Sequence, residues 1–87
     1  MIDIHPVDIY VGERLKHRRD ALGLSQVDIA RKIGISFQQL QKYERAVNRI
    51  SASRLYDISL ILDVDPSYFF EGYEDRTMQN RVPDFLV

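Results

Sequence analysis

The amino-acid sequence predicts a small all-α domain built from five helices. Apolar residues recur at intervals of three and four along most of the chain, and no segment shows the sustained alternation of apolar and polar residues that is typical of strands. Capping residues such as serine precede several of the apolar stripes, and glycines follow them. A chain of 87 residues has room for one domain with a single small core.

The first helix is predicted over residues 6–22, because Pro6 suits the first helical position and Gly23 supplies a stop. Gly12 interrupts this helix at a cost of up to about 1 kcal/mol in helix propensity. We therefore expect Gly12 to permit close packing against another helix rather than to act as a hinge. The apolar stripe of this helix comprises Val11, Leu15 and Leu22.

Two short helices are predicted on either side of Gly34, which is expected to end the earlier one. Residues 25–28 read Ser-Gln-Val-Asp and residues 36–39 read Ser-Phe-Gln-Gln, and each of these is a capping-box pattern that marks a helix start. Leu40 and Tyr43 of the later helix are expected to face the core.

The fourth helix is expected to be capped by Ser51 or Ser53, and the fifth is a short helix opened by residues 65–66, which read Asp-Pro. The buried stripe of the fourth helix comprises Leu55, Ile58 and Leu62. The fifth helix carries three aromatic residues before Gly72, and the chain then becomes polar until its apolar end at residues 83–87.

Composition excludes several classes of protein. The chain has no cysteine and only two histidines, which excludes disulfides, thiolate chemistry and a structural zinc site. No apolar run exceeds three residues and the first residues do not resemble a secretory signal, so we expect a cytoplasmic protein without membrane spans. Acidic residues are scattered singly and no phosphate-binding glycine loop is present. We expect no enzymatic activity, no cofactor and no small-molecule substrate.

The net charge of −1 hides an asymmetry along the chain. Residues 13–54 carry ten lysines and arginines against four acids, whereas residues 55–87 carry seven acids against two arginines. Because binding depends on the field of the contacting surface, a basic centre of this kind favours a polyanionic partner. The alternative is that these cations belong to solvated helical faces.

The arrangement of the second and third helices predicts a DNA-binding motif. A helix, a turn of three or four residues containing glycine, and a second helix form a helix-turn-helix, which sets one helix across a phosphate backbone and the next in the major groove. The outer face of the later helix is uncharged or basic, since Glu44 is displaced to its flank, and its glutamines offer both a donor and an acceptor to adenine. This face comprises Phe37, Gln38, Gln41, Lys42 and Arg45.

Residues 12–70 resemble the helix-turn-helix domain of the XRE family, which includes the phage repressors and Cro proteins, and the resemblance implies a lambda-repressor-like fold. Residues 1–11 would then form an N-terminal arm and the start of the first helix, and residues 71–87 a tail. The segment 37–45, followed by Asn48 and Arg49, is similar to short alphaproteobacterial regulators. The resemblance is carried by Arg19, Gly23, Leu24, Ser25, Gln26, Ala30, Gly34, Ser36, Leu40, Glu44, Arg45, Ser51, Leu55, Ile58, Leu62 and Val64.

The resemblance implies a role for each matching residue. The residues implied to face bases are Phe37, Gln38, Gln39, Gln41 and Lys42, of which Lys42 also lies where it can neutralise a phosphate. The residues implied to contact phosphates are Gln26, Ser36, Arg45, Asn48, Arg49 and Arg54. Phe37 either meets a thymine methyl group or packs on the protein itself. Arg19 and Glu44 match a structural ion pair between the first and third helices.

We expect a transcriptional regulator that binds an inverted-repeat operator as a homodimer, because one helix reads only a few base pairs. Occupancy of the operator is the mechanism we expect, as in a repressor, but the sequence leaves open whether occupancy blocks or recruits polymerase. A regulatory protein partner is also an open question. The candidate dimer-interface residues are Tyr56, Leu60, Phe70, Phe85 and Leu86, some of which could instead complete the core. The alternative is a protein-interaction module of the same fold, such as an antitoxin or adaptor, in which DNA binding is secondary.

Overall fold

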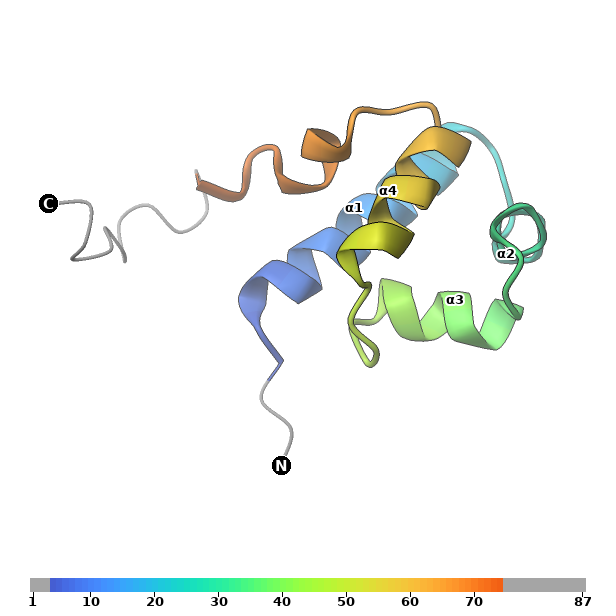
Figure 1. Ribbon diagram of the computed structural model, residues 1–87, viewed down its shortest axis with the longest axis horizontal. Coiled ribbons are helices and arrows are strands. Elements are labelled where there is room, and N and C mark those ends of the chain that lie inside the picture. The colour runs from blue at the N-terminus through green and yellow to red at the C-terminus, as the bar shows by residue number, and fades with distance from the viewer. Residues whose placement is uncertain (1–3, 75–87) are drawn as a thin grey trace, which may run out of the picture.

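The computed structural model describes residues 4–74 and confirms the all-α prediction (Figure 1). Its elements are α1 (Pro6–Ala21), α2 (Gln26–Ile33), α3 (Phe37–Glu44), α4 (Ala52–Ile61) and the 3-10 helix η1 (Pro66–Phe70). The predicted fifth helix is thus a 3-10 helix, because five residues starting at a proline are too few for a stable α-helix. Within residues 4–74 no helix is both long and apolar enough to cross a membrane.

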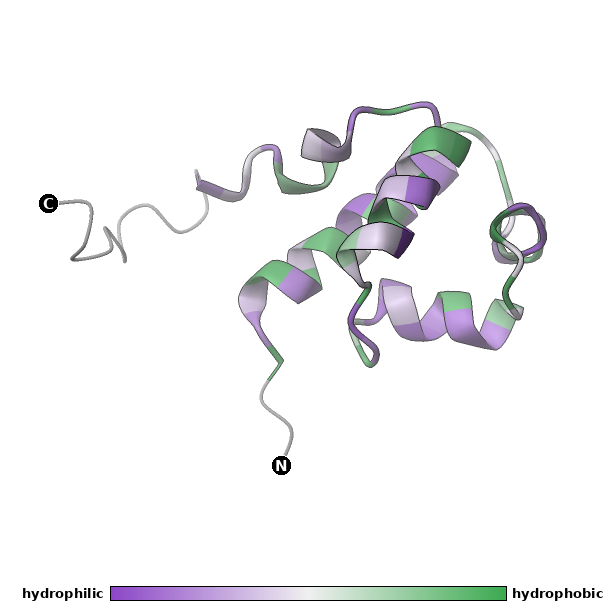
Figure 2. Ribbon diagram, viewed as in Figure 1, coloured by the Kyte–Doolittle hydropathy of each residue, from purple (hydrophilic) through white to green (hydrophobic). Residues whose placement is uncertain are grey.

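The core lies where α1, α2, α3, α4 and η1 meet, and each element contributes to it. α1 packs against α3 and η1, α2 packs against α3 and α4, and α4 packs against η1. Figure 2 shows that the helices carry both hydrophilic and hydrophobic residues, as expected for helices with one face in a core. The fully buried apolar side chains are Leu15, Ile29, Leu40, Ile58, Leu62 and Phe69.

Leu22 lies outside the core, contrary to the predicted apolar stripe of α1. α1 ends at Ala21, and Gly23 at φ 70° then turns the chain away, so that Leu22 is exposed while Leu24 packs against the core. The stripe predicted from the sequence extended one residue beyond the helix that carries it.

The two helices of the motif begin at the predicted capping residues, and α2 ends at the predicted glycine. Ser25 accepts a hydrogen bond from the Asp28 backbone N–H, and the Asp28 carboxylate accepts one from the Ser25 backbone N–H. Gly34 ends α2 with a φ of 85°, a left-handed conformation that favours glycine. Ser36 caps α3 by accepting from the Gln39 backbone N–H, but the Gln39 side chain does not return the bond, so the second capping box is only half formed.

Gly12 is the point of closest approach between α1 and the end of α3. A Cβ atom at this position would lie 2.6 Å from the Glu44 carbonyl oxygen and 2.7 Å from the Tyr43 carbonyl oxygen. Only a residue without a side chain permits this distance. The interpretation of Gly12 as a packing position is therefore correct.

Basic side chains of α1 hold the C-terminal half of the described chain. Arg18 Nε donates to the Leu62 carbonyl oxygen at 2.9 Å, at the end of α4. Arg14 Nε donates to the Tyr68 carbonyl oxygen at 2.9 Å, and its guanidinium carbon lies 3.8 Å from the centre of the Tyr68 ring. Part of the positive charge of residues 13–54 therefore serves the fold, which lowers the share that is available to a ligand.

Candidate nucleic-acid interface

α3 presents one face to solvent and buries the other. Leu40 is fully buried and Tyr43 packs against the core, which leaves the opposite face open. Residues 37–45 place no acid on this face, because the side chain of Glu44 is only 4% exposed and turns toward α1. The exposed residues of the face are Phe37, Gln38, Lys42 and Arg45.

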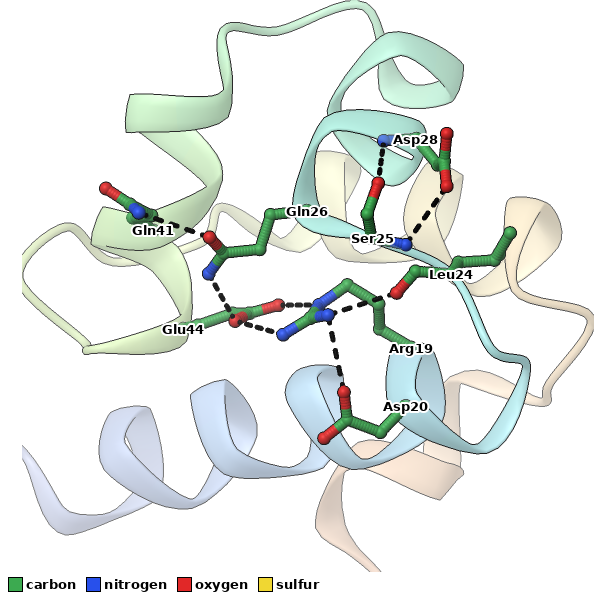
Figure 3. A network of polar contacts seen from close by, with 8 residues as sticks. All are labelled: Arg19, Asp20, Leu24, Ser25, Gln26, Asp28, Gln41 and Glu44. Atoms are coloured by element: carbon green, nitrogen blue, oxygen red, sulfur yellow. Dashed lines mark hydrogen bonds and ion pairs between the residues drawn. The ribbon is translucent and has the colours of Figure 1, made fainter.

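The buried ion pair of Arg19 and Glu44 fixes α3 to α1 (Figure 3). Arg19 Nε donates to Glu44 Oε2 at 2.7 Å and Nη2 donates to Oε1 at 3.1 Å, while Nη1 donates to the Leu24 carbonyl oxygen at 3.0 Å. The side chains are 9% and 4% exposed. The hydrogen bond to Glu44 raises the pKa of Arg19, so its guanidinium stays charged despite the opposing effect of burial.

Gln26 and Gln41 extend this network across α2 and α3. Gln26 Nε2 donates to Glu44 Oε1 at 3.0 Å, and Gln41 Nε2 donates to Gln26 Oε1 at 3.1 Å. Gln41 is half-buried with its amide nitrogen directed toward α2, so it does not project freely from the outer face as the helical spacing predicted. Gln26, expected at a phosphate, is likewise held by internal contacts.

Gln39 and Asn48 are joined by a hydrogen bond outside the face of α3. Asn48 Nδ2 donates to Gln39 Oε1 at 3.3 Å, and both residues are half-buried. Gln39 therefore supports the loop that follows α3, and its amide oxygen is already engaged. Ser36 is exposed at the N-terminus of α3, where it caps the helix.

The cations predicted at phosphates fall into two groups. The side chains of Lys42 and Arg45 are exposed and form no ion pair or hydrogen bond with any part of the chain that the structure describes. Arg49 Nε donates to Asp8 Oδ2 at 3.0 Å, and Arg54 Nη1 lies 3.5 Å from the Ile33 carbonyl oxygen. Asp8 was not foreseen as a partner, because no local signal connects residues 41 positions apart.

Three of the candidate dimer-interface residues are exposed on one part of the chain. Tyr56 and Leu60 lie on α4 and Phe70 ends η1, and all three side chains are exposed. Ile61, at the end of α4, packs against the core instead. Phe85 and Leu86 lie outside the described residues.

A family model described as Helix-turn-helix matches residues 15–69, the segment that contains α2, α3, α4 and most of η1. The chain belongs to the helix-turn-helix family. The resemblance to the XRE type is confirmed by this match and by the relatives below. The matched segment holds the ion pair, the capped turn and the exposed face of α3.

Curated relatives of this helix-turn-helix chain are transcriptional regulators by name. A transcriptional regulator in the ATPase CF(0) region of Rhodospirillum rubrum is 61% identical over 71 residues, which cover 82% of this chain and 66% of that protein. An HTH-type transcriptional regulator of Sinorhizobium medicae is 45% identical over 93 aligned positions, covering 94% of this chain and 67% of that protein. The match thus spans about two thirds of the length of these relatives.

Solved structures share the helix-turn-helix fold. The restriction-modification controller protein C.AhdI from Aeromonas hydrophila has a TM-score of 0.71 and 27% identity, covering 76% of this chain and 100% of that chain. The clp gene regulator ClgR from Corynebacterium glutamicum has a TM-score of 0.76 and 18% identity, covering 88% of this chain and 83% of that chain. The second of these similarities concerns the fold alone.

Proposed function

We propose that this chain regulates transcription by binding double-stranded DNA, with α3 in the major groove. The observation that carries the proposal is the exposed face of α3, where Gln38 lies beside the cations Lys42 and Arg45. Among residues 4–74, these two cations have no ion-pair partner and no carboxylate lies on this face. Lysine and arginine are attracted to the negative phosphate backbone of DNA, whereas acids are repelled by it. Glutamine is suited to hydrogen bonding with the edge of adenine. The family to which the chain belongs supports the same role.

Direct base contact is assigned to the free side chains of α3. The Gln38 side chain forms no hydrogen bond with the residues that the structure describes, so its amide is available for a bidentate contact with adenine. Phe37 is exposed at the start of α3, where its ring can meet a thymine methyl group. Lys42 lies one turn after Gln38 and reaches a base or a neighbouring phosphate. Gln39 acts by supporting Asn48, and Gln41 by supporting Gln26; each pair is joined by a hydrogen bond.

Phosphate contact is assigned to the two helix starts and to the loop after α3. Gln26 and Ser36 stand at the N-termini of α2 and α3, where free backbone N–H groups and the helix dipole favour an anion. Arg45, Asn48 and Arg49 follow at the end of α3, and the half-buried Arg54 follows on α4. These contacts set the register of the protein on DNA and carry no base preference.

A homodimer on an inverted repeat is part of the proposal. Two copies whose α3 helices lie about 34 Å apart would occupy successive turns of the major groove. Tyr56 and Leu60 on α4 and Phe70 at the end of η1 expose apolar surface, which suits a contact between copies. Sedimentation at micromolar concentration tests this part, and a monomer would refute it.

Selection of bound sequences from a random duplex pool tests the DNA-binding role. Gln38→Ala is expected to change the base preference at one position of each half-site, whereas Arg45→Ala is expected to weaken binding almost equally for all sequences. The logarithm of the association constant should fall with the logarithm of salt concentration, with a slope of about −0.9 for each phosphate contacted. Salt-independent or absent binding would favour the antitoxin or adaptor role.

A further inference from the structure

Asp8 and Arg49 form an ion pair that joins the start of α1 to the loop between α3 and α4. The donor is Arg49 Nε and the acceptor is Asp8 Oδ2, at 3.0 Å. The Asp8 side chain is 23% exposed and the Arg49 side chain is 74% exposed. Asp8 lies in the first turn of α1, where the helix dipole favours a negative charge. The carboxylate is thus mostly shielded from solvent, while the guanidinium remains open to it.

Other acids near the motif have structural partners. Asp20 and Glu44 both contact Arg19, and Asp28 caps α2 through Ser25. The pairing of Asp8 is different, because its partner Arg49 is a cation that the proposed function assigns to a phosphate. An acid in this place reduces the positive charge that the loop offers to DNA.

We propose that Asp8 restrains DNA binding by occupying Arg49, so that a backbone phosphate must compete with the Asp8 carboxylate for the guanidinium. A guanidinium binds phosphate best through two parallel N–H groups, and Asp8 takes the Nε donor of one such pair. The carboxylate also places a negative charge next to an arriving phosphate, a juxtaposition of like charges that opposes binding. Asp8 therefore limits affinity without touching a base. This inference rests on the proposed function.

The variants that test this proposal form a cycle of the wild type, Asp8→Asn, Arg49→Gln and the double variant. The dissociation constant for a selected operator duplex is measured by fluorescence anisotropy over a series of salt concentrations. Asp8→Asn is expected to tighten binding about two- to fivefold, the range typical of one exposed ion pair. The plot of the logarithm of the association constant against the logarithm of salt concentration should also become steeper by up to about 0.9, because Arg49 then neutralises a further phosphate and displaces its counterion. In the Arg49→Gln background the same change should tighten binding less than it does in the wild type, because only the repulsion between the Asp8 carboxylate and the phosphate is then relieved.

Asp8→Glu is the matched conservative variant and should retain wild-type affinity, because a glutamate keeps the carboxylate within reach of Arg49. Asp8→Ser is a second neutral replacement and should tighten binding as Asp8→Asn does. Far-UV circular dichroism of each variant checks that the helices are intact.

Three results would overturn the proposal. Weaker binding by Asp8→Asn would mean that Asp8 orients Arg49 for the phosphate. An equal gain with and without Arg49 would mean that Asp8 acts only through its distant charge. Failure of the wild type to bind any duplex in a salt-dependent manner would refute the proposed function as well, and this failure is recognised separately because it appears before any substitution is made.

Discussion

Replacement of Glu44 by leucine is expected to cost more stability than any other single change in the motif. The Glu44 carboxylate accepts from Arg19 Nε and Nη2 and from Gln26 Nε2, and its side chain is 4% exposed. Glu44→Leu leaves the buried guanidinium without this partner, at a cost of about 3–5 kcal/mol. A chain of 87 residues has a total free energy of unfolding of roughly 4–13 kcal/mol. The variant therefore loses a large fraction of its stability.

Urea unfolding followed by circular dichroism measures this loss. The matched control is Asp20→Asn, which removes the other acid beside Arg19. The Asp20 side chain is 58% exposed and its Oδ1 lies 3.3 Å from Arg19 Nη1, so the expected loss in the free energy of unfolding is below about 1 kcal/mol. The double variant Arg19→Met with Glu44→Leu is expected to recover most of the loss, because no buried charge remains. A single variant within about 1 kcal/mol of the wild type, or a double variant no better than the single one, would refute this reasoning.

Two further changes test the packing of α1 and the cap of α2. Gly12→Ala is expected to lower the free energy of unfolding by about 1–3 kcal/mol, because its Cβ would lie 2.6 Å from the Glu44 carbonyl oxygen and 2.7 Å from that of Tyr43. Thermal unfolding measures this effect, and an unchanged midpoint would contradict it. Hydrogen bonding by the Ser25 backbone lowers the pKa of Asp28, so its contribution to stability is complete above the ordinary carboxyl pKa and is lost as pH falls through the lower folded value. Asp28→Asn should therefore flatten the acid limb of the stability–pH curve in urea titrations, and a limb of unchanged shape would count against the role of this cap.

Local signals predicted most of the fold. Ser25 with Asp28, Gly34 and Ser51 each set a helix boundary through atoms within a few residues, and such contacts can be inferred from the sequence. The packing role of Gly12 was also predictable, since a glycine in a helix interior needs a compensating contact. The ion pair of Arg19 and Glu44 was expected from the family resemblance alone. The two residues are 25 positions apart, and no local pattern in the sequence connects them.

Side-chain directions on α3 were harder to predict. Helical spacing placed Gln41 on the outer face of α3, but spacing fixes only where a side chain leaves the helix. The glutamine side chain is long enough to turn back and donate a hydrogen bond to Gln26. Gln39 bonds to Asn48 rather than completing the capping box, because that loop returns beside α3. The contact of Asp8 with Arg49 depends on how α1 and the loop meet in space, which no local pattern encodes.

The row of side chains in Figure 3 has a single polarity. A guanidinium only donates and a carboxylate only accepts, so Gln26 must turn its nitrogen to Glu44 and its carbonyl oxygen to Gln41. Turning the Gln26 amide over would break both of these hydrogen bonds at once. Gln41 in turn points its nitrogen inward, and its carbonyl oxygen faces away from the row (Figure 3). The positive charge of Arg19 on α1 therefore determines, through Glu44 and Gln26, that the Gln41 amide on α3 turns its nitrogen inward and its carbonyl oxygen away from the row.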